Sequence, residues 1–467
     1  MSHSTTSFPI KALFLVTLFA LTIQLSCSYA DQIQKPEVNN HRVFFAKEPI
    51  FNSQIYVSES GMQHDRTVVL IHGVSEKASD DWKNVVDIVD DSFHVITFDL
   101  PGFGRSEKKD LIYSIEKYSS FLNWFIGTYT KKPISIVGHS LGGAISLYYA
   151  GTYPKGLDRL IIVDVPGILH RSAYFNSFVR LSPSAKNNSS NSPLNFLENV
   201  AGTSIKNVDS ILMPDNFKEF LNSDIIQNKT KEKDARTVAG ISLLDTDYSE
   251  IIANISTPTN IIWGENDSIA PIRTGRLLSG SIPISTLSII PNGSHSPMFT
   301  EPAEFNKILL SCLNGSTSIA IKDAPGDRQI EKQIVLNDEK DILLNGTYGK
   351  ILIKNCERIK LLNATVEQMI IENSEVTIEN SVIHSYTYAL NAIDSIITIT
   401  GSSIKGENAI IVNNCELDIA GGKIQGINSA IQSLYNTRIL FSVCKVKSML
   451  TDRYFHEILN VYINEPI

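Results

Sequence analysis

Short runs rich in isoleucine and valine alternate with longer amphipathic segments over residues 42–313. Continuous apolar runs of this kind are typical of parallel strands that are buried on both faces. The longer segments repeat their apolar positions with the period of a helix. We therefore predict a mostly parallel sheet covered by helices. The expected strands are residues 67–71, 93–98, 134–137, 160–163, 260–263 and 286–290, and the expected helices are residues 114–130, 141–153 and 302–313.

A long interruption of this alternation covers residues 166–248. It contains a polar segment at 182–192 and helical-looking pieces such as 215–221. Insertions of this size in a compact domain usually carry function, commonly as lids over an active site. The pattern predicts a helical cap inserted above the sheet, and such a cap would set the size of the groups that a substrate presents.

Beyond about residue 315, the helical period gives way to short strands separated by asparagine, serine and glycine. Matching apolar positions recur every 17 to 22 residues, at Ile342, Ile359 and Val376 and then at Ile378, Ile399, Ile419 and Phe441. In the same way Gly401 corresponds to Gly421, and Gly406 to Gly426. A period near 20 with one strand per repeat favours a solenoid, because each coil buries its inner face only against its neighbours.

The predicted solenoid is an all-β parallel β-helix. In period and strand content it resembles the right-handed helices of pectate-lyase-like proteins. Leucine-rich repeats fit poorly, because the apolar positions are chiefly isoleucine and valine and no helical segment separates the strands. A β-sandwich with regularly spaced strands is the alternative. The long flat face of such a solenoid suits a polysaccharide or a protein as partner.

The first 30 residues have the layout of a secretory signal peptide. Lys11 precedes an apolar run at 12–23, and small residues precede Asp31. The run is too short for an ordinary membrane span, so we expect no transmembrane helix in the mature chain. The protein would then be exported, either to the periplasm or as a secreted protein. Anchoring as a lipoprotein through Cys27 is disfavoured, because Gln24 stands where that signal expects an aliphatic residue.

The predicted division of the chain has four parts. They are the signal peptide at 1–30, an α/β domain at 31–315 with its cap at about 166–248, a linker at 316–334 and the repeat domain at 335–467.

The net charge of −8 gives no broad basic field, which argues against nucleic acid as a partner. Cysteine pairing cannot be read from the sequence, and small buried apolar residues are the simpler interpretation. The four cysteines beyond the signal segment are Cys312, Cys356, Cys415 and Cys444.

A nucleophile elbow is predicted at residues 138–142, which read Gly-His-Ser-Leu-Gly. In this motif, a sharp turn between a strand and a helix lifts the serine hydroxyl above the sheet. The expected strand at 134–137 precedes the motif, and small residues at 142–144 allow the following helix to pack closely. Ser140 is therefore the candidate nucleophile.

A serine nucleophile needs a base within hydrogen-bonding reach and an acid that orients the base. His295 is the candidate base, since it lies in a loop that follows an expected strand. Asp267 is the candidate acid, since it follows the strand at 260–263 and lies at the sheet edge where functional sites are found in open α/β sheets. Glu265 and Asp164 are the alternative acids. The order serine, acid, histidine is the one expected after an elbow of this kind.

Three further segments complete a resemblance to the α/β-hydrolase superfamily, specifically to its esterase, lipase and proline-iminopeptidase-like branches. They are Val69-Leu70-Ile71-His72-Gly73-Val74, Phe98-Asp99-Leu100-Pro101-Gly102-Phe103-Gly104-Arg105-Ser106 and Trp263-Gly264-Glu265-Asn266-Asp267. The resemblance implies an α/β-hydrolase sheet and a triad of Ser140, Asp267 and His295. It also implies an oxyanion hole made by the backbone amides of Val74 and Leu141, with no metal and no organic cofactor.

The expected reaction is acyl transfer to water through an acyl-enzyme. Halide-cleaving relatives carry an aspartate at the elbow, so the serine favours acyl chemistry over dehalogenation. A carboxylic ester, either a small molecule or a lipid, is the first substrate class, because the cleavage of a monoacyl ester makes the smallest demands on the catalytic site. Amide or peptide cleavage of the proline-iminopeptidase-like type is the alternative. A rival interpretation from another class is an exported binding or adhesion module without turnover.

Overall fold

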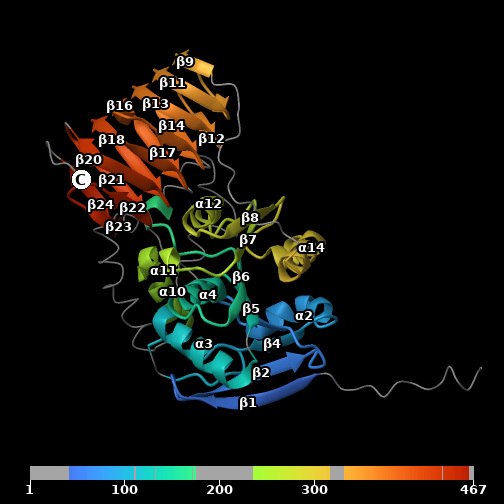
Figure 1. The fold of residues 1–467 in the computed structure, drawn as a ribbon. Helices are drawn as coiled ribbons and strands as arrows, with labels where there is room; N and C mark the ends of the chain where they lie inside the picture. The colour runs from blue at the N-terminus through green and yellow to red at the C-terminus, as the bar shows by residue number, and fades with distance from the viewer. Residues whose placement is uncertain are drawn as a thin grey trace, which may run out of the picture.

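The computed structural model describes residues 41–109, 112–131, 133–170, 172–174, 235–315, 331–433 and 435–461. An eight-stranded sheet with helices on both faces is followed by a stack of short strands that lies against one side of it (Figure 1). The predicted fold class, an α/β sheet plus an all-β solenoid, is confirmed. The predicted signal peptide and most of the predicted cap and linker lie outside the described residues. Within the described ranges, no helix is long and apolar enough to cross a membrane.

The first sheet has the strand order β1-β2-β4-β3-β5-β6-β7-β8. Its strands are β1 (Arg42–Glu48), β2 (Ser53–Ser60), β3 (Thr67–Ile71), β4 (His94–Phe98), β5 (Ile134–His139), β6 (Leu157–Val163), β7 (Thr259–Gly264) and β8 (Ser285–Ile290). From β4 to β8 every neighbouring pair is parallel, so their carboxyl ends lie at one edge of the sheet. The predicted strands thus fall within a few residues of the observed ones.

The antiparallel hairpin of β1 and β2 was not among the expected strands. It joins the sheet through antiparallel pairing of β2 with β4. The Glu48 carboxylate holds its turn by accepting hydrogen bonds from the backbone N–H groups of Ile50, Phe51 and Ser53 at 2.7–3.1 Å. In β1 the burial alternates only weakly, which is why its sequence gives little strand signal.

Helices cover both faces of this sheet. They are η1 (Ala78–Trp82), α2 (Lys83–Val89), α3 (Ile115–Tyr129), α4 (Leu141–Thr152), α10 (Ala235–Asp245), α11 (Ser249–Ala253), α12 (Ile272–Ser281), α13 (Pro297–Thr300) and α14 (Pro302–Leu313). Successive residues of β3 enter opposite cores: Val69 belongs to the core that contains residues of α3, α4 and α12, whereas Val68 belongs to the core that contains residues of α2 and α14. Of the predicted cap, α10 is described, and its buried residues join the first of these cores.

The second body is built from two sheets of mostly parallel strands. One has the order β10-β12-β14-β17-β19-β21-β24 and the other β23-β22-β20-β18-β15-β13-β11-β9, with β16 between β13 and β18. The strands are β9 (Glu331–Asn337), β10 (Leu343–Leu344), β11 (Thr347–Lys354), β12 (Ile359–Leu362), β13 (Thr365–Glu372), β14 (Glu375–Glu379), β15 (Val382–His384), β16 (Tyr388–Ile393), β17 (Ile396–Thr400), β18 (Ser403–Asn413), β19 (Glu416–Ala420), β20 (Lys423–Ser433), β21 (Thr437–Ser442), β22 (Cys444–Lys447), β23 (Asp452–Phe455) and β24 (Ile458–Val461). Strand β9 crosses the predicted domain start at 335.

The register of these strands confirms the repeat that the sequence predicts. Ile359 pairs with Val376, and Ile378, Ile399, Ile419 and Phe441 pair in succession. Gly406 pairs with Gly426. The inward side chains of the two sheets form a single apolar core, so each coil is stabilised by the coils beside it. The last two strands, β23 and β24, pair antiparallel with β22 and β21 and so end the parallel stack.

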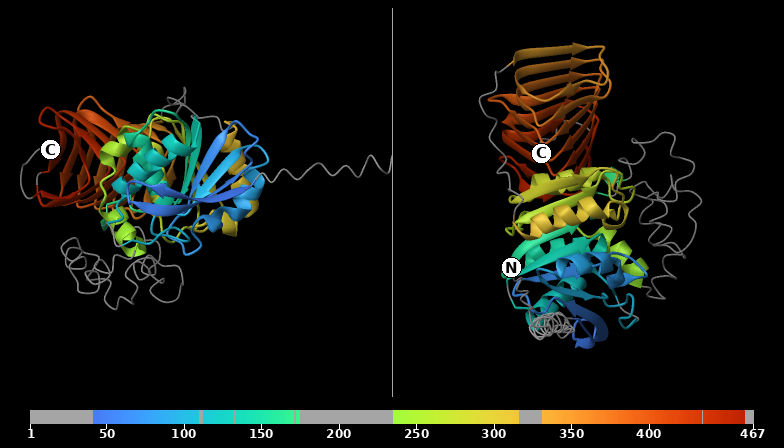
Figure 2. Two further views of the ribbon diagram at one scale, coloured as in Figure 1. Left: turned by 90° about the horizontal axis from the view of Figure 1, so that it is seen from below. Right: turned by 90° about the vertical axis from the view of Figure 1, so that its right-hand side faces the viewer.

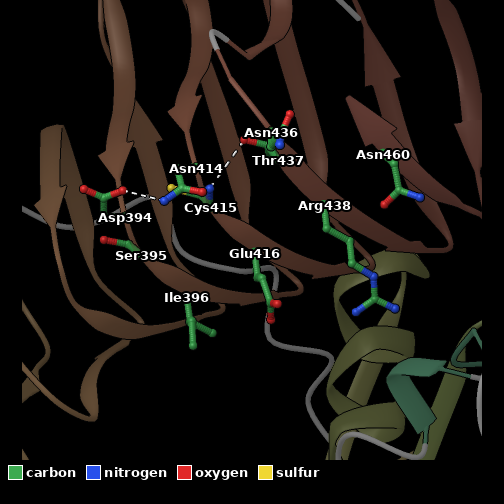
Figure 3. Close-up of a pocket in the computed structure, with 10 residues that line it drawn as sticks. All are labelled: Asp394, Ser395, Ile396, Asn414, Cys415, Glu416, Asn436, Thr437, Arg438 and Asn460. Carbon is green, nitrogen blue, oxygen red and sulfur yellow. Dashed lines mark hydrogen bonds between the residues drawn. The ribbon is translucent and has the colours of Figure 1, made fainter. Parts of the chain in front are cut away.

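One corner of the solenoid carries a ladder of exposed asparagines and aspartates with positive φ. Asn355 donates to Asp338 at 3.2 Å, Asn373 to Asn355 at 3.0 Å and Asn414 to Asp394 at 2.7 Å. A polar pocket of about 390 Å³ lies at the end of this ladder (Figure 3). The four cysteines beyond the signal segment are buried, Cys356, Cys415 and Cys444 in the solenoid and Cys312 in α14, which agrees with their interpretation as small apolar residues.

The solenoid is docked on α12 and α11, with β17 against α12 and β23 against α11. The strands of this side are drawn in orange and red in Figures 1 and 2. Arg273 of α12 makes a two-pronged ion pair with Asp418, with N···O distances of 2.7 and 2.9 Å. Arg276 pairs with Glu379 at 2.7 Å. Gly401, with φ of 59°, lies so close to α12 that a Cβ on Gly280 would come within 2.6 Å of its Cα. The two bodies therefore share a packed, charged interface.

Candidate active site

Ser140 lies at the turn between β5 and α4, where the elbow motif predicts it. Its backbone has φ of 52° and ψ of −118°, a region that residues other than glycine rarely adopt. A Cβ on Gly142 would lie 2.3 Å from the carbonyl oxygen of Ile71, so only glycine lets α4 begin this close to β3. The turn therefore holds the serine in a strained conformation, which is a feature of functional sites.

The side chains of Ser140, His295 and Asp267 form one hydrogen-bonded chain. The Ser140 Oγ lies 3.0 Å from the His295 Nε2, and the His295 Nδ1 lies 2.9 Å from the Asp267 Oδ2. Because a carboxylate only accepts, Nδ1 carries the proton and Nε2 is left to accept from the serine hydroxyl. The Asp267 side chain is fully buried and that of His295 is 15% exposed, so water screens the pair weakly. With the proton on Nδ1 and Nε2 free to accept, His295 has the tautomer that a general base needs.

Asp267 is oriented by its own loop after β7. Its Oδ1 accepts hydrogen bonds from the backbone N–H groups of Ile269 at 2.7 Å and Ala270 at 2.9 Å. These two bonds leave Oδ2 to face His295. The alternative acid Glu265 is exposed and instead accepts a hydrogen bond from the Asn292 N–H at 3.2 Å. The structure thus brings Asp267 to the histidine and leaves Glu265 outside the chain of hydrogen bonds.

The third candidate acid, Asp164, lies directly after β6 and is fully buried. Its Oδ1 accepts a hydrogen bond from the Gly264 N–H at 2.9 Å, and its carboxyl group interacts with that of Asp267. Burial raises the pKa of Asp164 well above its ordinary value, and the neighbouring charge of Asp267 raises it further. Asp164 is therefore a neighbour of the acid.

The backbones of Val74 and Leu141 lie beside the nucleophile. Leu141 is the first residue of α4, and the N–H groups of a first helical turn have no partner within the helix. Gly73, next to Val74, approaches so closely that a Cβ on it would lie 2.9 Å from the Ser140 Cβ. The N–H of Leu141, at the positive end of the α4 dipole, is suited to bind a developing oxyanion.

Two buried histidines hold the backbone of this site. The His72 Nε2 accepts from the Leu100 N–H at 2.9 Å, so its Nδ1 donates to the Gly73 carbonyl oxygen at 2.7 Å. The His139 Nε2 donates to the His295 carbonyl oxygen at 2.7 Å. Burial lowers the pKa of both histidines, that of His139 to about 3, so both remain neutral. Each histidine fixes one loop that borders Ser140.

Asp99 and Arg105 explain why the segment at 98–106 contains both charges and glycines. The Arg105 Nε and backbone N–H both donate to the Asp99 Oδ2, at 2.9 and 2.7 Å, and Ser79 donates to Oδ1. Burial would raise the pKa of Asp99, but the hydrogen bonds from Arg105 and Ser79 outweigh it and its pKa is lowered. The buried carboxylate therefore closes a tight turn next to the loop that His72 holds.

Among the described residues, no group of three or more histidine, cysteine, aspartate or glutamate side chains is arranged to hold a metal ion.

Comparisons with known proteins identify the family of this chain. The family described as alpha/beta hydrolase fold matches residues 66–302, which is just over half of the chain, and the protein belongs to that family. An uncharacterized protein of Mycobacterium tuberculosis is 27% identical over 259 residues, which cover 52% of this chain and 73% of the relative. The human monoacylglycerol lipase ABHD6 is 25% identical over 283 residues, which cover 54% of this chain and 76% of that enzyme.

Among solved structures, the fold is similar to that of a bacterial membrane phospholipase A. That protein is 20% identical to this chain, with a TM-score of 0.45 over 66% of this chain and 98% of the phospholipase.

The structure brings together Ser140, Asp267 and His295, as the sequence predicts. The sequence does not predict the contact between Asp267 and Asp164. The strand ends at 163 and 264 signal that both aspartates lie at the same sheet edge. No sequence feature signals that β6 and β7 are neighbours, and this pairing is what brings the two carboxyl groups together.

Proposed function

We propose that this protein is an exported serine hydrolase that cleaves a carboxylic ester through an acyl-enzyme. The observation that carries the proposal is the chain of hydrogen bonds from Ser140 through His295 to Asp267, with heavy-atom distances of 3.0 and 2.9 Å. The strained backbone of Ser140 supports it, because such a turn exposes the hydroxyl to a substrate. Membership of the α/β hydrolase fold family supports hydrolysis as the reaction class.

In the proposed mechanism, His295 removes the proton of the Ser140 hydroxyl as Oγ attacks the carbonyl carbon of the ester. The N–H groups of Val74 and Leu141 hold the oxyanion of the tetrahedral intermediate. His295 then gives the proton to the leaving alcohol, and water repeats both steps on the acyl-enzyme. Asp267 stays ionised and stabilises the imidazolium of His295 throughout.

The substrate proposal rests on two points. Relatives that match about half of this chain are named monoacylglycerol lipases, which makes a lipid or small-molecule ester the first choice. Such an ester has one acyl group and a leaving alcohol that needs only one proton from His295. Amide cleavage asks more of the same base, because an amine is a poorer leaving group than an alcohol.

Labelling with a fluorophosphonate probe tests the enzyme assignment. We expect the wild-type protein to label at Ser140 and the Ser140→Ala variant to stay unlabelled at an unchanged melting temperature. A folded wild-type protein that never labels would favour a binding module without turnover. The Glu265→Gln variant is the matched control, since it removes an exposed carboxylate of the same loop, and we expect it to label like wild type.

A panel of acyl p-nitrophenyl esters and aminoacyl anilides tests the substrate class. Ester turnover should exceed anilide turnover, and the reverse result would replace the ester proposal by amide hydrolysis.

Export is tested by sequencing the amino terminus of the protein produced in its host. Cleavage after residue 30 supports the signal peptide, and a lipid-modified Cys27 would replace it by a lipoprotein anchor.

A further inference from the structure

Asp164 is a buried carboxyl group that the mechanism above does not use. It directly follows β6, is fully buried and has a φ of 48°. Aspartate tolerates this left-handed conformation better than most residues, but a buried example persists only where the surroundings impose it. Its backbone N–H donates to the Ile262 carbonyl oxygen at 3.2 Å, which ties the residue to the neighbouring strand β7.

The two side-chain oxygens of Asp164 differ in their surroundings. Oδ1 accepts the hydrogen bond from the Gly264 N–H at 2.9 Å. Oδ2 is buried without a donor, and the carboxyl group of Asp267 is the hydrogen-bonding neighbour of the Asp164 carboxyl group. Two ionised carboxylates have only acceptors, so they would repel each other and leave Oδ2 unsatisfied. One proton on the pair removes both problems.

The count of donors decides which residue holds that proton. Asp267 accepts three hydrogen bonds, from the N–H groups of Ile269 and Ala270 and from the Nδ1 of His295. Asp164 accepts one, from Gly264. Hydrogen bonds to a carboxylate favour its charged form. The charge therefore belongs on Asp267 and the proton on the Oδ2 of Asp164.

We propose that Asp164 is a neutral carboxylic acid that donates a hydrogen bond from Oδ2 to Asp267, and that it positions Asp267 for His295. The role as a positioning residue rests on the proposed function, whereas the protonation state does not. The donated bond is the fourth that Asp267 accepts, and it fixes the ionised carboxylate with one oxygen toward the imidazole. The direction of the pKa of Asp164, raised first by burial and then by Asp267, agrees with a neutral group.

Infrared difference spectroscopy tests the protonation state without any turnover. We expect the wild-type protein at neutral pH to show the carbonyl stretch of a buried protonated carboxylic acid, and we expect the band to be absent from Asp164→Asn. A wild-type spectrum without such a band overturns the proposal. The asparagine variant should fold, because asparagine also tolerates the left-handed conformation.

The pH profile of ester hydrolysis tests the positioning role. In Asp164→Asn, the amide oxygen accepts from Gly264 and the amide N–H donates to Asp267, so no charge is lost. We expect kcat/KM within about threefold of wild type and an acid limb of the profile shifted by no more than about 0.3 pH unit. If Asp164 were ionised, its removal would take away a negative charge near the active site, and a fall of about one unit in the acid limb of the profile would overturn the proposal.

The Asp164→Ala variant removes the donor altogether. We expect kcat to fall about tenfold at unchanged KM, since Asp267 loses one charge-assisted hydrogen bond. Glu265→Gln is the control and should keep both the wild-type kcat and the wild-type acid limb. Wild-type kcat in a folded Asp164→Ala protein would overturn the positioning role. If no protein turns over ester or reacts with a fluorophosphonate, the proposed function fails, and the infrared band still decides the state of Asp164.

Discussion

Positive backbone φ serves different purposes in the two halves of the molecule. In the hydrolase half, the buried residues Ser140 and Asp164 are among those that adopt it, and they lie at the ends of two neighbouring strands. In the solenoid it recurs at one corner of successive coils, on exposed side chains. These residues are Asp338, Asn355, Asn373, Asp394 and Asn414. The left-handed region costs most residues about 1–2 kcal/mol, and asparagine and aspartate adopt it more readily than others.

The two halves therefore stabilise an unfavourable backbone conformation in different ways. The ladder corner of the solenoid uses asparagine and aspartate, the residue types that tolerate the conformation, so it needs little support from the surrounding packing. The hydrolase half imposes the conformation on a serine through the surrounding packing, because the chemistry needs that side chain. Substitutions should therefore have local effects in the solenoid ladder and functional effects at the elbow, while the contact between the halves should matter to stability.

The interface between the halves should give the largest effect. Removing one partner of a buried ion pair leaves the other charge buried, so Asp418→Ala should lower the free energy of unfolding by about 3 kcal/mol. The Arg273 and Asp418 side chains are only 13% and 8% exposed. Urea denaturation measures the change. The exposed pair of Lys354 and Glu372 is the control, and Glu372→Gln should change the stability by less than about 0.5 kcal/mol. Equal effects of the two variants would mean that the ion pair does not hold the halves together.

The elbow should give the next largest effect, on activity. In Gly73→Ala the new Cβ would meet the Ser140 Cβ at 2.9 Å and displace the backbone beside Val74. We expect kcat/KM for an ester to fall about a hundredfold, or about 2.7 kcal/mol, as on losing an oxyanion donor. Gly127→Ala makes the same change in α3 with no atom within 4 Å, and its turnover should equal wild type. An active Gly73→Ala enzyme would refute the packing argument.

The buried Asp164 should give a pH-dependent effect on stability. Its pKa is raised in the folded protein, so its contribution to stability is fully present below the unfolded value and is lost as pH rises toward the folded value. Wild type should therefore lose stability relative to Asp164→Asn as pH rises from about 4, by up to about 1.4 kcal/mol per pH unit. Denaturation curves at a series of pH values measure this difference. A difference that is constant with pH contradicts the raised pKa.

The ladder of the solenoid should give the smallest effect. Alanine at position 373 adopts the left-handed conformation less easily than asparagine and loses the hydrogen bond to Asn355. We expect Asn373→Ala to lower the free energy of unfolding by about 1 kcal/mol. Asn373→Gly, which has no Cβ, should cost about half as much or less. Ester turnover should be unchanged in both variants, and a loss of turnover would show that the two halves are coupled beyond their interface.

Much of the fold could be predicted from sequence because its signals are local or periodic. The strand predicted at 67–71 is β3, and the predicted spacing of Ile399 and Ile419 is their observed register. The hairpin of β1 and β2 was missed, because an edge strand with exposed faces lacks the continuous apolar run of a buried one.

The sequence by itself determined the elbow at Ser140, the order of the three candidate side chains and the coil length of the solenoid, since each depends on neighbouring residues or on a repeat. Only the tertiary structure decided that Asp267 rather than Glu265 reaches His295, that Asp164 lies against Asp267 and that Arg273 meets Asp418. These contacts join residues far apart in the chain. Their geometry follows from which strands pair and which helix faces the solenoid, and no local pattern of residues encodes that.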